Sequence, residues 1–275
     1  MSYKDILVYL DDGDSNSERV KAAFLLAKLH NAHLTGVTLA SVKPRHLKIA
    51  DTKAETRISQ VEAEDRAKGF TELAKEQGIE SDCRVIKGGM GEAAYKFAQF
   101  ARNFDLLMLR QANPNNKNFA LIKAVTEEVI LYSGRPIYFM PYIGAHRIPC
   151  KKAMIAWDGS PPATRAVHDA LPMLQHIEKV TILVAQEGKK KTEKGQLLAS
   201  NLVTHLKRHG VNAKVRRVTT GSFDVPTVLL NEIAENDIDF LVMGGYGTPN
   251  LKQKIFGGVT RTLLSSMVIP VFMSH

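Results

Sequence analysis

A set of glycines near the end of the sequence has the spacing of a phosphate cradle. Gly244 and Gly247 follow an apolar stretch, and nine residues later Gly257 and Gly258 precede a segment typical of a helix. Glycine at a strand-to-helix crossing lets backbone N–H groups approach a ligand closely, and the amino terminus of the following helix favours an anion. The pattern predicts a phosphate site, although the same glycines are also typical of tight turns.

The sequence resembles two copies of one unit, and this repeat places the glycines within a fold. Segment 105–109 matches segment 239–243, and segment 6–11 matches segment 153–158 at the same point of the second copy. A repeat of this length indicates two tandem domains rather than stacked short repeats. A chain of 275 residues is also long enough for two cores. We place the domains at residues 1–143 and 150–275, with a linker over 142–149.

Each half alternates strands with helices, which predicts a parallel sheet covered by helices on both faces. In the second half we expect strands at 153–157, 180–185, 213–218, 240–243 and 270–273, and helices at 162–174, 196–208, 225–235 and 259–267. The first half repeats this order, with a second strand at 34–40 and a long charged helix over 52–77. The predicted fold class is α/β, with two tandem doubly wound parallel-sheet domains.

Composition limits the classes of function. The two cysteines, Cys83 and Cys150, support no disulfide framework and fit a reducing compartment. We find no signal peptide and no apolar run long enough to span a membrane, so a cytoplasmic protein without a membrane partner is expected. Residues 1–143 carry 20 Lys and Arg against 18 Asp and Glu, which gives +2, whereas residues 144–275 carry 17 against 10, which gives +7. The second half therefore favours an anionic ligand, and we expect no specific nucleic-acid partner.

The glycine spacing resembles the nucleotide motif of the universal stress protein family. That motif is Gly, two residues, Gly, nine residues, Gly, then Ser or Thr, and Gly244, Gly247 and Gly257 fit it. Asp158, which ends the first strand of the second half, is similar to the family's ribose- and adenine-side aspartate. Ala185 matches a position that lines the adenine pocket. The resemblance covers nearly the whole chain, in the family's tandem form.

The resemblance implies a stress-response protein whose second domain binds an adenine nucleotide, ATP or AMP, with or without Mg²⁺. It also implies Rossmann-like domains of the adenine nucleotide alpha hydrolase-like kind, related by a pseudo-two-fold axis. The predicted nucleotide-binding residues are Asp158, Ala185, Gly244, Gly245, Gly247, Gly257, Gly258, Val259 and Thr260. Because Gly258 stands where the family has Ser or Thr, we expect weaker phosphate binding.

We predict no catalytic residue and no metal ligand, because Walker A and kinase motifs are missing. A binding or regulatory protein is therefore favoured over an enzyme. Slow nucleotide hydrolysis, or adenylation by an enzyme of related fold, stays open as the alternative. An interaction module that binds no nucleotide is a third hypothesis.

The first half keeps the strand-ending aspartate, Asp11, but not the glycines. Arg110, Asn113 and Lys123 occupy the positions of the three motif glycines. Side chains therefore stand where a backbone cradle needs none. One interpretation is a degenerate domain that is kept for pairing and stability. In the other, Arg110 and Lys123 attract a different anion.

Two further features of the second half each have two interpretations. Trp157 either lies against a nucleotide base or belongs to the core. His205 and His209 have the spacing of a helical metal pair, but no third ligand is evident, so a solvated helix end is favoured.

The last strands of the two halves, Ile137–Met140 and Val271–Met273, are short and apolar. The resemblance implies that they pair across the pseudo-two-fold axis, so that one chain imitates a homodimer. Such pairing would satisfy the free N–H and C=O groups of both edges. The sequence leaves open whether two chains then form a further homodimer.

Overall fold

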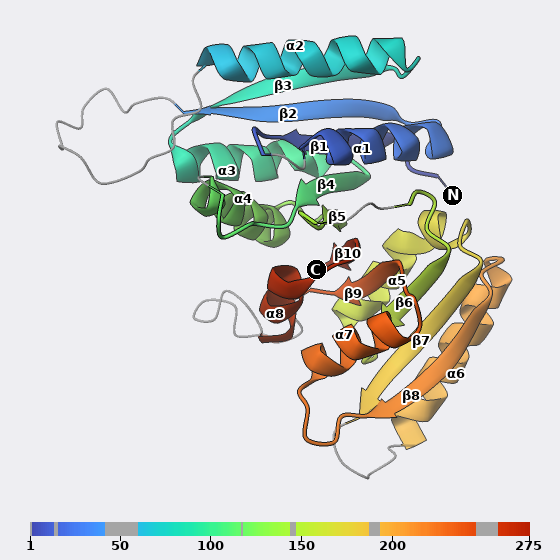
Figure 1. Ribbon diagram of the computed structural model, residues 1–275. Helices are drawn as coiled ribbons and strands as arrows, with labels where there is room; N and C mark the ends of the chain where they lie inside the picture. Colours follow the sequence, from blue (N-terminus) through green and yellow to red (C-terminus); the bar gives the residue numbers. More distant parts are fainter. Residues whose placement is uncertain are drawn as a thin grey trace. The chain divides into compact units, whose positions relative to one another are not determined.

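The computed structural model describes residues 2–13, 16–41, 60–116, 118–143, 147–186, 193–245 and 258–275. The chain forms two compact units (Figure 1). The amino-terminal unit is Tyr3–Arg135, and the carboxy-terminal unit contains Pro136–His275. The strand at 137–140, which the sequence analysis assigned to the first domain, thus belongs by its contacts to the carboxy-terminal unit.

The amino-terminal unit contains a four-stranded parallel sheet with the strand order β3-β2-β1-β4. Its elements are β1 (Asp5–Leu10), α1 (Asn16–His30), β2 (His33–Ser41), α2 (Gln60–Glu76), β3 (Ser81–Gly88), α3 (Met90–Phe100), β4 (Leu106–Arg110) and α4 (Phe119–Tyr132). The predicted helix over 52–77 therefore begins at Gln60 in the structure, and residues 52–59 lie outside the described residues.

The carboxy-terminal unit contains six strands in the order β5-β10-β9-β6-β7-β8. Its elements are β5 (Ile137–Met140), β6 (Lys152–Ala156), α5 (Pro161–Leu174), β7 (Lys179–Gln186), α6 (Glu193–Arg208), β8 (Ala213–Thr219), α7 (Val225–Glu235), β9 (Phe240–Gly244), α8 (Gly258–Ser266) and β10 (Val271–Ser274). All neighbouring strands are parallel except β5, which is antiparallel to β10. The predicted fold class, tandem doubly wound α/β units, is confirmed.

Local sequence explains where the helices next to the sheet begin. Ser160 caps α5 by accepting a hydrogen bond from the N–H of Ala163 at 3.3 Å, and prolines fill the first two helical positions. Asp224 caps α7 in the same way, with Thr227 N donating to its carboxylate at 3.0 Å. Hydrogen bonds to the Thr227 side chain and to the Thr227 N–H lower the pKa of the Asp224 carboxyl group. The central strands are apolar and buried, so both sheets have covered faces.

The predicted pairing of the two final strands is present. In β5 and β10, Phe139 lies opposite Val271, Tyr138 opposite Phe272, and Ile137 opposite Met273. All residues of β5 are buried, as are those of β10. The backbone groups of β10 are therefore paired on both sides, by β9 and by β5.

A fragment of residues 136–275 is expected to stay monomeric, because it keeps β5 against the edge of β10. A fragment of residues 150–275 lacks β5 and exposes that edge, so we expect it to self-associate and to unfold at a lower temperature. Light scattering after gel filtration, with a thermal melt of each fragment, measures both effects. A strictly monomeric 150–275 fragment of unchanged thermal stability would contradict this role of β5.

Candidate functional site

The strand order of the carboxy-terminal unit creates a crevice beside β6. The chain passes from β6 to β7 and β8 on one side, and then returns to β9 on the other side of β6. Ligands of open α/β sheets bind at such a reversal, outside the carboxyl ends of the strands. Asp158 follows the end of β6, Ala185 lies at the end of β7, and Gly244 ends β9. The topology alone therefore brings three predicted site residues to one edge.

A cavity of about 420 Å³ occupies this crevice. Of the predicted site residues, its lining includes Asp158, Ala185, Gly244, Gly258, Val259 and Thr260. Gly245 lies next to the lining rather than in it, because it is buried and its N–H donates to Ser274 O at 2.7 Å. Gly247 and Gly257 lie outside the described residues.

Asp158 is held by a local turn and remains exposed to solvent. One of its carboxylate oxygens accepts a hydrogen bond from Ser160 N at 2.9 Å. Among the described residues it makes no ion pair, and it is the only charged residue in the lining. The basic excess of the second half therefore does not reach this part of the cavity. Attraction for an anion must come here from backbone dipoles.

Trp157 presents an unused hydrogen-bond donor at the cavity. Its backbone N–H donates to Leu183 O at 2.9 Å, which continues the register between β6 and β7. Its indole Nε1 is buried, and no described residue accepts its hydrogen. Trp157 also lines the cavity and is half-buried, so it is not an entirely buried core residue, and its contact with a nucleotide base stays a prediction. A ligand acceptor beside the ring would satisfy the indole N–H.

Gly244 and Gly258 have different structural roles. A Cβ on Gly244 would lie 2.5 Å from Ala163 N and 2.7 Å from the carbonyl carbon of Pro162. Gly244 is therefore required for the close approach of β9 to the start of α5. A Cβ on Gly258 would meet nothing within 4 Å, and Gly258 is not among the residues with positive φ. Gly258 is the first residue of α8, and the first turn of this helix lines the cavity. The N–H groups of this turn have no intrahelical partners.

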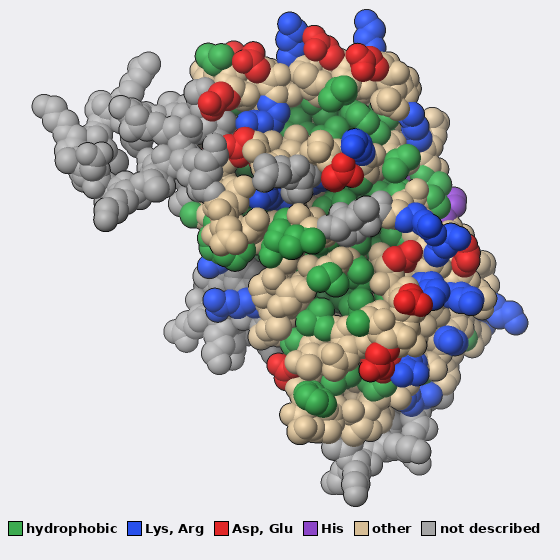
Figure 2. All heavy atoms as spheres, viewed as in Figure 1, with side chains coloured by type: hydrophobic (Ala, Val, Ile, Leu, Met, Phe, Trp, Pro, Cys, Tyr) green, Lys and Arg blue, Asp and Glu red, His purple; other side chains and the backbone are tan. Residues whose placement is uncertain are grey.

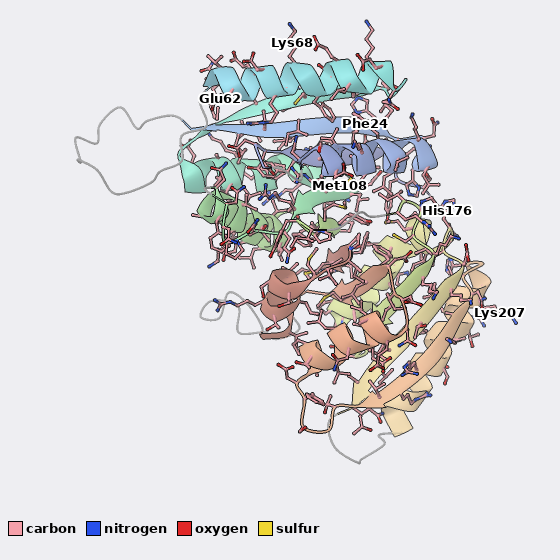
Figure 3. All side chains as sticks on the ribbon, viewed as in Figure 1. Phe24, Glu62, Lys68, Met108, His176 and Lys207 are labelled. Atoms are coloured by element: carbon pink, nitrogen blue, oxygen red, sulfur yellow. The ribbon has the colours of Figure 1, made fainter. Side chains whose placement is uncertain are left out.

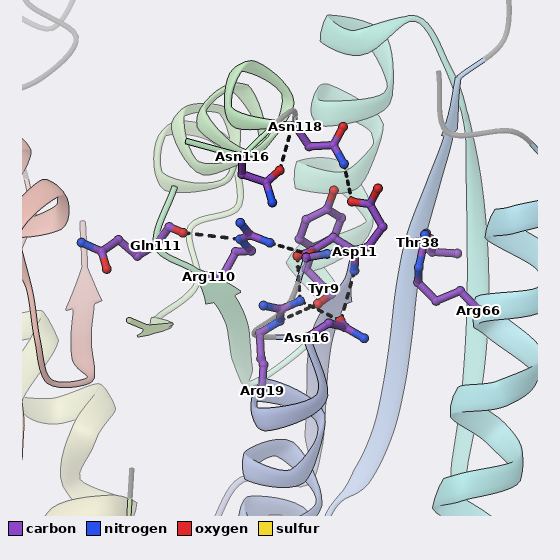
Figure 4. A network of polar contacts seen from close by, with 12 residues as sticks. Tyr9, Asp11, Asn16, Arg19, Thr38, Arg66, Arg110, Gln111, Asn116 and Asn118 are labelled. Carbon is purple, nitrogen blue, oxygen red and sulfur yellow. Dashed lines mark hydrogen bonds and ion pairs between the residues drawn. The ribbon is translucent and has the colours of Figure 1, made fainter. Parts of the chain in front are cut away.

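The matching position of the amino-terminal unit is filled by the protein's own side chains (Figure 4). Asp11 forms ion pairs with Arg19 and with Arg110, each at 2.7 Å. All three side chains are almost completely buried. Gly13 N also donates to Asp11 at 2.6 Å, and Arg19 Nε donates to Tyr9 O at 2.8 Å. Burial lowers the pKa of Arg19, while the Asp11 charge opposes this shift.

Arg110 does not present its charge to an external anion, so that interpretation of the sequence is wrong for this residue. Its guanidinium lies over Gly13, where an added Cβ would be only 1.8 Å from Nη1. Lys123 is half-exposed and lies 3.8 Å from Glu127 on the same helix. The sequence placed Arg110 opposite Gly244, but it did not show that Asp11 would receive the side chain.

Sequence reasoning also missed part of the site and a histidine cluster. Ser160 and Pro162 line the cavity. The predicted start of a helix at these residues is the sequence feature that could have identified them. His205 is half-buried, and its ring lies 4.9 Å from that of His168 and 4.6 Å from that of His209. Partial burial and these neighbouring rings lower the pKa of His205. The described residues contain no group of three side chains placed to hold a metal ion.

Comparison with known structures supports the same fold for the whole chain. A universal stress protein from Archaeoglobus fulgidus is 16% identical, with a TM-score of 0.68, and the match covers 98% of this chain and 95% of that one. A protein from Pseudomonas aeruginosa described as a putative universal stress protein is 13% identical, with a TM-score of 0.63 and coverage of 99% and 93%. A search of curated protein sequences found no match. No helix among the described residues has the length and apolar character needed to cross a membrane.

The family comparison is specific for the half that contains the cavity. The model described as the universal stress protein family matches residues 149–275. This segment contains β6 to β10 and every predicted nucleotide-binding residue. The order of strands and helices in the amino-terminal unit follows the same plan. Residues 149–275 of this chain thus match the universal stress protein family.

Proposed function

We propose that the carboxy-terminal unit binds one adenine nucleotide, ATP or AMP, and that nucleotide occupancy is the regulatory state of a stress-response protein. The observation that carries the proposal is the cavity beside β6, which brings Asp158, Ala185, Gly244 and the start of α8 together. Its volume of about 420 Å³ is in the usual range for small-molecule sites. The adenine and ribose would lie between Asp158 and Ala185, with the Trp157 indole N–H as a further donor.

The phosphates would lie against backbone N–H groups of the stretch from Gly244 to Gly247, other than the Gly245 N–H that donates to Ser274 O, and against those at Gly257 to Thr260. The first turn of α8 contributes unpaired N–H groups and the positive end of the helix dipole. Thr260 is buried in the lining, and Val259 packs beside it. A Mg²⁺ ion that accompanied ATP would be coordinated mainly by phosphate oxygens and water, since Asp158 is the only carboxylate of the described lining.

The same lining favours binding over rapid turnover. Proton transfer and phosphoryl transfer need positioned acids, bases or cations near the reacting phosphate. The described lining offers only the Asp158 carboxylate for these roles. We therefore propose a binding protein with at most slow ATP hydrolysis, rather than an adenylating enzyme.

Mass spectrometry of the undenatured purified protein tests the proposal directly, since a bound nucleotide would add its mass to the chain. We expect AMP or ATP at up to one molecule per chain. A steady-state assay with ATP and Mg²⁺ then separates binding from catalysis. Turnover faster than about 1 s⁻¹, the low end of typical enzymes, would assign the chain to the enzymes instead. Absence of binding to any added adenine nucleotide would leave only the interaction module.

Gly258→Ser is expected to strengthen ATP binding by about fivefold. The new hydroxyl would stand at the start of α8 and donate a hydrogen bond to a phosphate, which contributes about 1 kcal/mol. The substitution fits, because the space around a Cβ at Gly258 is open. Calorimetric titration of Gly258→Ser beside Gly258→Ala isolates the hydroxyl. Equal affinity of the two variants would show that no phosphate lies at this helix start.

A further inference from the structure

A second cavity, of about 600 Å³, lies in the amino-terminal unit between α1 and α2. Both helices cover the same face of the sheet, because they connect β1 to β2 and β2 to β3 in a row of parallel strands. The rings of Phe24 and Phe70 form part of its wall, 5.9 Å apart. Figure 2 shows hydrophobic side chains on the surface between these two helices. The proposed nucleotide site is in the other unit, so this cavity is separate from it.

One glycine leaves open space at the cavity, and another, on the strand beneath it, lets two lining side chains pack close to the sheet. Below it, a Cβ on Gly36 of β2 would lie 2.8 Å from the Phe70 ring and 2.9 Å from Leu10, so glycine lets these side chains pack directly on the strand. On α2, Gly69 lines the cavity, and a Cβ there would meet nothing within 4 Å. The open space of the groove therefore follows from the missing side chain of Gly69 rather than from loose packing of the two helices.

The lining is apolar in its middle and positively charged at its margins. Val20, Phe24, Leu25, Phe70 and Leu73 provide the apolar wall. Leu25 and Leu73 are 47% and 50% exposed, and both line the groove, so together they add exposed apolar surface to it. The charged lining residues are Lys21, Lys28 and Arg66, and no Asp or Glu is among the described residues of the lining.

Arg66 is the half-buried cation of this lining, and no described carboxylate neutralises it. Its Nη1 donates to Thr38 Oγ1 at 2.8 Å, and it makes no ion pair with any described residue. Lys21 is instead paired with Glu18 at 2.8 Å, and Lys28 donates to Gln77 at 3.0 Å. Arg66 is also half-buried, so its remaining guanidinium N–H groups favour an anionic acceptor.

The charged and apolar parts follow one another along the groove. The two helices run in the same direction, with Phe24 next to Phe70 and Lys28 bonded to Gln77. Arg66 comes one helical turn before Phe70, so it lies toward the first turn of α1, where Asn16 begins the helix. The cavity thus has Arg66 at one end, an apolar channel in its middle, and Lys28 at the other end.

We propose that this cavity binds a medium-chain fatty acid, with its carboxylate on Arg66 and its alkyl chain between α1 and α2. A carboxylate matches the planar guanidinium, which donates two parallel N–H groups to it. The alkyl chain would cover Leu25 and Leu73. The volume fits one small amphipathic molecule, since pockets for such ligands measure about 300 to 1,000 Å³.

Titration of the full chain with dodecanoate, followed by calorimetry, tests the proposal. We expect one site per chain, with affinity that falls by about fourfold for each methylene removed in a series down to octanoate. Dodecanol, which has the same chain without the charge, is expected to bind at least about tenfold more weakly. Equal binding of dodecanol and dodecanoate would overturn the role of Arg66, and no saturable binding of dodecanoate would overturn the site.

Two substitutions with matched controls locate the site. Arg66→Gln is expected to weaken dodecanoate binding by at least about tenfold, whereas Lys68→Gln removes a charge from the exposed side of the same helix and should change nothing (Figure 3). Gly69→Leu fills the groove and should abolish binding, while the same change at Gly91, on α3 and also free of steric conflict, should not.

Gly69→Leu also replaces a helical glycine by a better helix former, so loss of binding with an unchanged or higher melting temperature excludes unfolding as the cause. Undiminished binding by Gly69→Leu would overturn the proposal. So would a concentration-dependent dimer of the parent that Gly69→Leu removes and dodecanoate does not, because the groove would then be an interface between two chains.

Discussion

Asp11→Asn is expected to destabilise the amino-terminal unit by about 3 to 5 kcal/mol, the usual cost of removing one partner from a buried ion pair. The carboxylate is the shared acceptor of two guanidinium groups, from Arg19 and Arg110, and of the Gly13 N–H. Asparagine keeps one acceptor oxygen but removes the charge, and its NH₂ group would face a guanidinium donor. Two buried cations would then lack their counter-ion.

Urea unfolding followed by circular dichroism measures this loss, and the carboxy-terminal unit provides the control. Asp158→Asn changes the corresponding aspartate, which is exposed and lies in no ion pair with a described residue, so its effect on stability should stay within about 0.5 kcal/mol. Trp157 is the only tryptophan, so its fluorescence reports on the carboxy-terminal unit during the same titration. A loss below about 1 kcal/mol for Asp11→Asn would show that the buried cluster is not held by this carboxylate.

Gly244→Ala is expected to destabilise the carboxy-terminal unit by about 1 to 3 kcal/mol, as overpacking does in a dense core. The added methyl group would overlap the backbone of Pro162 and Ala163, neither of which can move aside as a flexible side chain could. Ala163 N also donates the capping hydrogen bond of α5. The clash would therefore displace the start of α5 and the end of β9 together, and with them the proposed nucleotide site.

Gly258→Ala is the matched control, because the same methyl group enters open space at the other side of the cavity. Trp157 fluorescence during urea unfolding gives the stability of both variants, and calorimetry gives their affinity for ATP. Gly244→Ala should lower both the stability and the affinity for ATP, whereas Gly258→Ala should leave both unchanged. Parent-like stability in Gly244→Ala would remove the packing role that the structure gives to this glycine.

The fold could be predicted because its signals are local. The run of apolar residues at Phe240 predicts a buried strand, and Ser160 before two prolines predicts the start of α5. The helix Val225–Glu235 has the same bounds in the structure as in the sequence analysis. Alternation of these elements then fixes a parallel sheet, and the internal repeat indicates that there are two.

The sequence predicts that some candidate site residues lie together, namely those that stand at the ends of strands. Asp158, Ala185 and Gly244 each end a strand, and the ends of parallel strands meet at one edge. The sequence could not show which backbone a glycine faces, so Gly244 was assigned to a phosphate cradle or a tight turn, and its packing role was missed. Its contact with Pro162 depends on how α5 packs on β9.

Long-range side-chain contacts explain the other differences. Arg110 and Asp11 are 99 positions apart, and their ion pair depends on the pairing of β1 with β4. The groove at Arg66 likewise depends on the gap between α1 and α2, which are far apart in the sequence. Periodicity identifies each helix, but the space between two helices follows from packing alone.

These contacts give the two halves different chemical states. In the amino-terminal unit, Asp11 is already neutralised by the protein's own guanidiniums. In the carboxy-terminal unit, Asp158 is exposed beside an open cavity. The proposal that one half binds nucleotide and the other does not therefore rests on a physical difference between two aspartates at matching positions.

Calorimetric titration with ATP measures the number of sites per chain and tests this proposal most directly. We expect one site per chain, lost in Asp158→Ala and kept in Asp11→Asn under conditions where both variants are folded. Two equivalent sites, or one site that survives in Asp158→Ala, would contradict the assignment of nucleotide binding to the cavity beside β6.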